Sequence, residues 1–284
     1  MIETNTALVT GGTDGIGKAL VVKLAESGYT VCFIGRDRTK GQSTLQMAKQ
    51  IHPEGHHRFY QVDLCNMSDI KEFARSFKKN HTTLRLLYLN AGTIPPSHYT
   101  ESSEGIETAF AVNYLHRYLL THLLLDELKA ATPSRIVITS APGRSTNKLN
   151  LNDINLTRGY KPLLATDCAA EANEIFTVHM AKHLENLGIT INTINPGIVN
   201  TNISRNSPMP LRIAMNIMDK LNISKKPSLV ADELYKLGTS SSFSSVTGRL
   251  FVKGKEITTN SSIVNVQKAN KLLDVSLELC NLKE

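Results

Sequence analysis

The sequence predicts an α/β fold in which helices cover both faces of a doubly wound, mostly seven-stranded parallel sheet. Two observations support this prediction. A short apolar run, Ala7 to Val9, is followed by a glycine cluster and then by apolar residues at helical spacing from Lys18 to Gly28, the pattern of a strand, a tight turn and a helix. Strand and helix signals then alternate along the chain. With 284 residues, 41% of them hydrophobic, the chain can bury one large core, so we expect a single domain over residues 1–284.

The later elements follow the same alternation. Apolar runs predict strands at residues 29–34, 58–62, 84–89, 135–139 and 249–252. Helical patterns lie between them, one ending near Gln50 and others over residues 68–78, 103–130, 228–238 and 262–279. In such a sheet the strands end at a common edge, which is where ligands bind.

The glycine cluster after the first strand predicts a dinucleotide site. A turn without side chains lets backbone N–H groups at the start of the next helix approach a pyrophosphate, and the positive end of the helix dipole meets its charge. Such a cluster can also be an ordinary tight turn, but its position between a strand and a helix favours the cofactor site. The residues concerned are Gly11, Thr13, Asp14, Gly15, Ile16 and Gly17.

The end of the second strand predicts which dinucleotide binds. The residue after this strand meets the adenosine ribose, where an acidic side chain favours a free 2′-hydroxyl and an arginine accommodates a 2′-phosphate. Arg36 occupies that place, so we expect NADP(H) rather than NAD(H). The neighbouring Asp37 keeps open the alternative that Arg36 is an ordinary loop residue.

Short motifs also follow the third and fourth strands. Asp63 and Leu64 come after the third strand, and Asn90, Ala91 and Gly92 come after the fourth. Each motif alone could be a loop. Two of them at the carboxyl ends of successive strands indicate one shared binding edge.

Together these motifs resemble the short-chain dehydrogenase/reductase family. The stretch from Thr10 to Gly17, TGGTDGIG, resembles the cofactor motif of that family, and residues 247–252 resemble its retinol-dehydrogenase-like branch. The resemblance implies a Rossmann fold, with Asp63 and Leu64 at the adenine and residues 90–92 closing on the nicotinamide side. It further implies cofactor contacts around a Pro-Gly motif, at Pro196, Gly197, Val199 and Thr201.

The resemblance is incomplete at the active site. It implies that Asn113 holds a structural water, with a polar bridge across a helix kink as the alternative, and that Ser140 hydrogen-bonds the substrate carbonyl. Family members carry a tyrosine and a lysine four residues apart on the next helix, and the lysine lowers the tyrosine pKa so that the phenol exchanges a proton near neutral pH. This chain has Thr166 and Ala170 in those places, so we expect an atypical site without the pair.

Other side chains near that helix are candidates for chemistry. Tyr160 precedes the helix and is our candidate catalytic tyrosine, with a packed loop aromatic as the simpler interpretation. Asp167 could supply a proton if burial raised its pKa, although a carboxylate at a helix start is usually a dipole partner. His179 and His183 have the i, i+4 spacing of zinc ligands but lack the glutamate of H-E-x-x-H, so no metal is expected.

Two functions are consistent with these features. The first is an NADP(H)-dependent oxidoreductase that transfers hydride to a bulky apolar carbonyl or imine/iminium substrate without the usual tyrosine acid; an iminium carbon needs no enzymic proton. Residues 202–226, rich in methionine, suit a flexible lid over such a substrate or an ordinary amphipathic helix. The alternative is a cofactor-binding non-redox protein, such as a scaffold, a regulator or a cyclase. The intact cofactor motifs favour the first function, and the missing pair favours the second.

Composition narrows the partners and the location. The net charge is +7, but Lys and Arg are spread along the chain, so no nucleic-acid partner is expected. No apolar run reaches the about 20 residues of a membrane span. The scattered Cys32, Cys65, Cys168 and Cys280 fit a reducing compartment, and we expect a cytoplasmic protein. The family resemblance adds a homodimer or homotetramer to these expectations.

Overall fold

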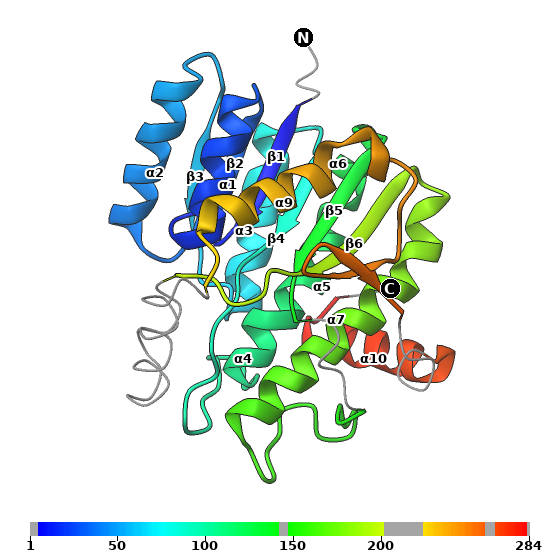
Figure 1. Ribbon diagram of the computed structural model, residues 1–284. Coiled ribbons are helices and arrows are strands. Elements are labelled where there is room, and N and C mark those ends of the chain that lie inside the picture. Colours follow the sequence, from blue (N-terminus) through cyan, green and yellow to red (C-terminus); the bar gives the residue numbers. More distant parts are fainter. Residues whose placement is uncertain (1–4, 142–146, 202–223, 259–264, 283–284) are drawn as a thin grey trace.

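The computed structural model describes residues 5–141, 147–201, 224–258 and 265–282 (Figure 1). Its strands form one sheet in the order β3-β2-β1-β4-β5-β6-β7-β8. All neighbouring pairs are parallel except β7 and β8, which are antiparallel. The strands are β1 (Thr6–Thr10), β2 (Thr30–Gly35), β3 (Arg58–Gln61), β4 (Leu86–Leu89), β5 (Ser134–Thr139), β6 (Ile189–Asn195), β7 (Leu250–Val252) and β8 (Lys255–Ile257).

Helices cover both faces of this sheet, as Figure 1 shows. Side chains of β1 alternate between two separate core clusters: Leu8 packs in the first, whereas Ala7 and Val9 pack in the second. The first cluster includes α3 (Met67–Asn80), α5 (His116–Leu123), α7 (Pro162–Glu185) and α10 (Val266–Leu279); the second includes α1 (Gly15–Glu26), α2 (Arg38–Ile51) and α9 (Pro227–Thr239). Shorter elements are α4 (Thr108–Phe110), η1 (Ala111–Leu115), α6 (Leu125–Ala130) and η3 (Ser241–Phe243).

The predicted fold class is confirmed, with two differences in detail. The Lys-Glu-Ile tripeptide of β8 is too short to give a strand signal; it pairs with β7 through a tight turn at Lys253 and Gly254, which both have positive φ. The helix expected over residues 103–130 begins at Thr108, where the Glu107 carboxylate accepts hydrogen bonds from the first N–H groups. It is then interrupted by η1, a π-helical turn, and again at Leu124. The expected lid lies outside the described residues, except for 224–226.

The strand order places a switch point beside β1. Its neighbours are β2 on one side and β4 on the other, so the connections from β1 and β4 leave in opposite directions and open a crevice at the carboxyl ends of the strands. That crevice is where this class of fold binds ligands.

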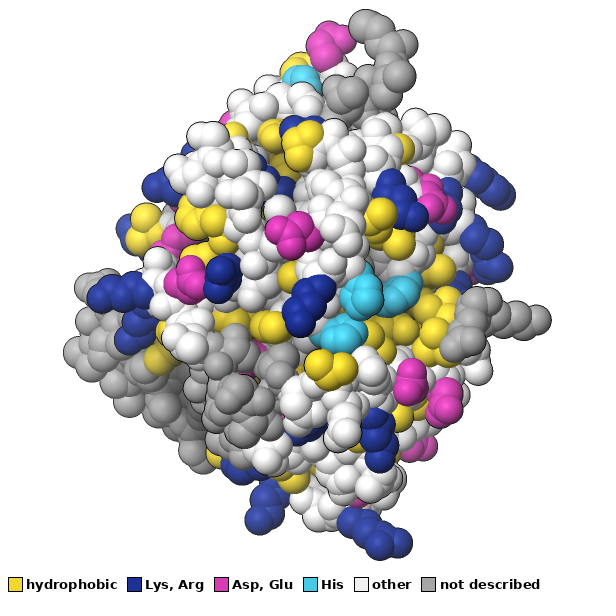
Figure 2. Space-filling view, turned by 90° about the vertical axis from the view of Figure 1, so that its right-hand side faces the viewer, with side chains coloured by type: hydrophobic (Ala, Val, Ile, Leu, Met, Phe, Trp, Pro, Cys, Tyr) yellow, Lys and Arg dark blue, Asp and Glu magenta, His cyan; other side chains and the backbone are white. Residues whose placement is uncertain are grey.

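The spread of surface charge and the composition of the helices relate to two kinds of partner, nucleic acid and membrane. On the face that Figure 2 shows, Lys and Arg side chains are spread out with carboxylates between them and do not gather into one basic patch. Among the helices that the structure describes, none has both the length and the apolar character needed to cross a membrane.

Candidate active site

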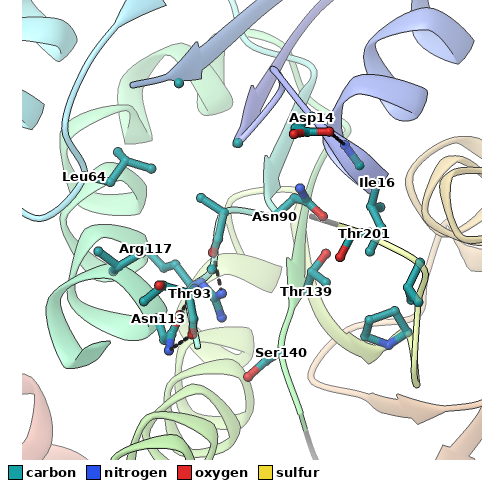
Figure 3. Close-up of a pocket in the computed structure, with 18 of the residues that line it drawn as sticks. Asp14, Ile16, Leu64, Asn90, Thr93, Asn113, Arg117, Thr139, Ser140 and Thr201 are labelled. Carbon is teal, nitrogen blue, oxygen red and sulfur yellow. Dashed lines mark hydrogen bonds between the residues drawn. The ribbon is translucent and has the colours of Figure 1, made fainter. Parts of the chain in front are cut away.

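A cavity of about 680 Å³ lies at the carboxyl ends of β1, β2, β3, β4, β5 and β6 (Figure 3). Its volume lies in the range of cofactor and small-ligand sites. Asp14 and Ile16 lie at one part of the cavity wall, and Asn113, Arg117 and Ser140 lie at another. The residues expected from the sequence that line it are Gly11, Thr13, Asp14, Gly15, Ile16, Arg36, Asp63, Leu64, Asn90, Ala91, Gly92, Asn113, Ser140, Pro196, Gly197, Val199 and Thr201.

At its glycine positions, the turn after β1 does not admit a side chain. Gly11 and Gly15 adopt φ values of +70° and +51°, which favour glycine. A Cβ atom on Gly17 would lie 2.1 Å from the carbonyl oxygen of Gly11, so this glycine allows α1 to pack against the turn, although it does not line the cavity itself. Asp14 caps α1 by accepting a hydrogen bond of 2.8 Å from the N–H of Gly15. The turn therefore fits the pyrophosphate of a dinucleotide, as the sequence predicts.

One end of the cavity, which we call the adenosine end, is formed by Arg36, Lys40, Asp63 and Leu64. Asp37 does not line it, because its carboxylate caps α2 by accepting a hydrogen bond of 3.0 Å from the N–H of Lys40. Lys40 forms an ion pair with Asp14 and lines the cavity together with Arg36. The sequence analysis missed Lys40; the signal was its spacing of four residues from Arg36, at the start of a helix.

The opposite end, which we call the α7 end, is formed by residues 90–93, Asn113, Arg117, Ser140, Thr166 and Ala170. The loop after β4 is fixed by two sets of hydrogen bonds. The N–H of Ala91 donates to the Thr10 hydroxyl at 2.9 Å. The Asn113 amide accepts from the N–H of Thr93 at 2.8 Å and donates to its carbonyl at 3.0 Å (Figure 3). Asn113 thus bridges η1 and this loop, and its role in holding a structural water stays a prediction.

Helix α7 presents uncharged side chains to the cavity. Thr166, Ala169 and Ala170 are its lining residues, and the Thr166 hydroxyl donates to the carbonyl of Pro162 at 3.0 Å. The helix contains no tyrosine, and its lysine, Lys182, does not line the cavity. Ser140 reaches the cavity from the end of β5, where its N–H donates to the carbonyl of Ile194 at 3.0 Å.

The proposed substitute donors lie elsewhere. Tyr160 does not line the cavity; its hydroxyl donates to the carbonyl of Pro96 at 2.9 Å, and burial raises its pKa to about 12. Asp167 does not line it either, because its carboxylate is buried and lies 3.3 Å from the ammonium of Lys148. The catalytic role of Tyr160 stays a prediction, and this geometry does not bring its hydroxyl to Ser140.

Arg117 is a further lining residue that was not predicted from the sequence, because a basic residue on a helix is usually solvated. Its side chain is only 2% exposed. One terminal nitrogen donates to Asn173 Oδ1 at 3.0 Å and the other to the carbonyl of Ala91 at 2.8 Å. Burial lowers the pKa of the guanidinium to about 9, so it remains charged at neutral pH.

The histidines considered as zinc ligands lie on α7. No group of three or more candidate ligands occurs in the part of the chain that the structure describes. The rings of His179 and His183 pack against each other with their centroids 5.2 Å apart.

The fold and the site define a dinucleotide-binding protein of the Rossmann class. The family model of short chain dehydrogenases matches residues 5–150. Human retinol dehydrogenase 14 is 30% identical over 97% of this chain and 86% of its own. The chain therefore belongs to the short-chain dehydrogenase/reductase family, in its retinol-dehydrogenase-like branch, and it is an oxidoreductase whose family uses a nicotinamide dinucleotide.

Further relatives agree with this assignment. Human polyprenol dehydrogenase is 33% identical, over 75% of this chain and 66% of its own. A short-chain dehydrogenase/reductase of unknown function from Caenorhabditis elegans, solved with cofactor, has a TM-score of 0.72 at 20% identity and covers 94% of this chain and 98% of its own. Levodione reductase has a TM-score of 0.71 at 17% identity, over 89% of this chain and 98% of its own. The two structures support the fold.

Proposed function

We propose that the protein is an NADP(H)-dependent oxidoreductase that reduces a bulky apolar carbonyl or imine without a tyrosine acid. The observation that carries this proposal is one continuous cavity with two basic side chains at its adenosine end and no ionisable side chain from α7 at the other. When bound, the reduced nicotinamide supplies the hydride. The chain's own residues would then bind the dinucleotide and orient the substrate.

The adenosine end supports NADP(H). Arg36 and Lys40 both line it, and the one nearby carboxylate that favoured the alternative, Asp37, is used in capping α2. Two cations suit a 2′-phosphate, whose charge they can meet by charge-assisted hydrogen bonds. The adenine would lie against Asp63 and Leu64, and the pyrophosphate against the turn after β1.

The α7 end supports a substrate that needs little from an enzymic acid. Thr166 and Ala170 stand where the family resemblance places the tyrosine and the lysine, and neither can transfer a proton at neutral pH. Ser140 can donate a hydrogen bond to the carbonyl oxygen, and water supplies the proton that the alcohol needs. The buried charge of Arg117 disfavours a cationic substrate, so the structure favours a carbonyl or a neutral imine over a preformed iminium. The names of the retinol and polyprenol dehydrogenases support an apolar substrate.

Cofactor preference is tested by titration calorimetry with NADPH and NADH. We expect Arg36→Leu to weaken NADPH binding by about 1.5–3 kcal/mol, the cost of a lost charge-assisted contact, and to leave NADH binding unchanged. Arg38→Leu is the matched control, because Arg38 is an exposed neighbour that does not line the cavity. Equal affinities for the two dinucleotides in the wild type contradict the assignment.

The reaction is tested by stopped-flow oxidation of NADPH with a panel of apolar ketones and aldehydes. Without a positioned donor, we expect rates about 10²- to 10⁴-fold below those of sites that have one. Tyr160→Phe should change the rate less than about twofold, because its hydroxyl is bonded to Pro96 outside the cavity. Ser140→Ala should lower it more. If Tyr160→Phe abolishes turnover, the donor is Tyr160; if no compound oxidises bound NADPH, the non-redox alternative replaces this proposal.

A cytoplasmic location and a homodimer or homotetramer complete the proposal. All four cysteines are free and buried, as suits a reducing compartment. Subcellular fractionation tests the location, and light scattering of the purified protein measures the oligomeric state.

A further inference from the structure

Arg117 places a positive charge in the cavity wall without a counter-ion among its contacts. Its hydrogen-bond acceptors are an amide oxygen and a backbone carbonyl, from Asn173 and Ala91. A guanidinium has five N–H donors. Its Nε has no partner among the described residues. Arg117 therefore lines the cavity as a cation that is only 2% exposed and has no carboxylate among its hydrogen-bond partners in the described part of the chain.

The surroundings do not neutralise this charge. The other described residues of the α7 end are uncharged, while the charged lining residues, Asp14, Arg36, Lys40 and Asp63, follow β1, β2 and β3. His116, the preceding residue, is fully buried, and burial and the Arg117 charge hold its pKa well below the usual value, so it is neutral. Charge interactions in such a poorly solvated setting are stronger than in water.

We propose that Arg117 determines which redox form of the dinucleotide the cavity prefers, favouring the reduced form. The inference rests on the proposed function and on the family resemblance, which implies that the nicotinamide lies beside residues 90–92. The carbonyl of Ala91 holds the guanidinium against this loop, and Figure 3 shows Arg117 beside Asn113 and Thr93. An oxidised nicotinamide ring carries a positive charge and a reduced ring does not, so Arg117 repels the oxidised ring alone. Across one cavity wall this repulsion corresponds to about a tenfold difference in affinity.

The test is the ratio of the dissociation constants of NADP⁺ and NADPH, measured by titration calorimetry. In the wild type we expect NADPH to bind at least about tenfold more tightly than NADP⁺. Arg117→Gln, which removes the charge and keeps an amide donor for Ala91, should lower the ratio about tenfold. Arg117→Lys should retain most of it. Arg38→Gln, at an exposed residue outside the cavity, is the control and should leave the ratio unchanged.

A second variant separates charge from packing. Arg117→Gln combined with Ala170→Lys returns a cation to the same end of the cavity and should restore the preference for NADPH. An unchanged ratio in Arg117→Gln overturns the inference and leaves the proposed function intact. If Arg117→Gln does not fold, the measurement on the wild type still tests the inference, because equal affinities for NADP⁺ and NADPH overturn it. Failure of the wild type to bind either form overturns the proposed function itself.

Discussion

At the scale of single residues, three of the four glycines after β1, Gly11, Gly15 and Gly17, have different roles. Gly11 and Gly15 are needed for their positive φ, whereas Gly17 is needed for space, since a Cβ atom there would meet the carbonyl oxygen of Gly11. The spacing of these glycines, together with their position between a strand and a helix, predicted a cofactor turn. Which of them face the ligand and which allow the helix to approach depends on tertiary contacts that the spacing does not contain.

Gly17→Ala tests this division. We expect it to lower the free energy of unfolding by about 1–3 kcal/mol through overpacking. NADPH affinity should fall about tenfold or more, because the turn must move away from the pyrophosphate position. Gly28→Ala is the control: its φ of +78° is strained for alanine, but no atom lies within 4 Å of the new Cβ and the site is remote from the cavity. Calorimetry showing normal NADPH affinity in Gly17→Ala would contradict this role.

Single residues also mark the limit of prediction from the sequence. Motif residues at strand ends line the cavity because the parallel sheet brings those ends together. Lys40 and Arg117 lie inside helices, where a basic residue is indistinguishable from a solvated one until the packing is known. The Tyr160 prediction rested on nearness along the chain, and a loop residue has no periodic pattern that fixes its direction.

At the scale of elements, α7 packs in the core cluster that also includes α3, α5 and α10, and a buried ion pair connects α10 to α7. The Glu171 carboxylate of α7 is fully buried and accepts hydrogen bonds from the N–H groups of Lys148 and Leu149, at 3.0 and 3.4 Å. Lys268 of α10 forms an ion pair with the same carboxylate. One acidic side chain therefore holds two distant segments against the helix that borders the active site.

Lys268→Met should be strongly destabilising, by about 3–5 kcal/mol, because it leaves the Glu171 charge buried and uncompensated. The control is Lys23→Met: Lys23 pairs with Asp232 at 3.1 Å with both side chains more than a third exposed, and its loss should destabilise the protein far less. Urea unfolding of both variants measures the difference. Similar costs for the two would show that the buried pair contributes no more than a surface pair.

The order of the elements could be predicted, and the interruption by η1 could not. Apolar periodicity identifies α5 and its neighbours as one helical stretch, because each turn of it packs on the core. The π-helical turn is instead stabilised by Asn113 and Asn173 through hydrogen bonds to residues far away along the chain. Such partners carry no local signal.

At the scale of the whole molecule, several histidines are kept neutral by burial. Burial lowers the pKa of His57, His116, His122 and His179. His57 shows why neutrality matters: its Nδ1 accepts a hydrogen bond of 3.0 Å from the N–H of Val31, near the start of β2. Protonation would turn this acceptor into a donor.

The protein should therefore lose stability as the pH falls below about 6.5, the pKa of a free histidine. The folded protein has the lower histidine pKa values, so the unfolded chain binds more protons at pH values just below about 6.5. The free energy of unfolding therefore rises with pH through this range, and the stability from the neutral histidines is fully present above about pH 6.5. Burial raises the pKa of Glu107, so the folded protein holds this proton more readily than the unfolded chain does. This one group makes the free energy of unfolding fall as the pH rises, which opposes the effect of the histidines.

Urea unfolding at pH 5, 6 and 7.5 measures this slope. His57→Gln, which keeps an acceptor for Val31 without titrating, should flatten it, and the exposed His56→Gln should not. A slope that is the same in all three proteins would exclude His57 as a contributor.

The small strand β8 also has a consequence for how copies of the protein meet. Without it, β7, the apolar Leu-Phe-Val strand, would end the sheet with a row of free N–H and carbonyl groups, a template on which another chain could add a strand and aggregate. The hairpin covers that row with a strand of three residues that begins with Lys255 and Glu256, both exposed. A short, charged, outward-facing end is poor at recruiting further strands, so β8 acts as a terminator of sheet growth.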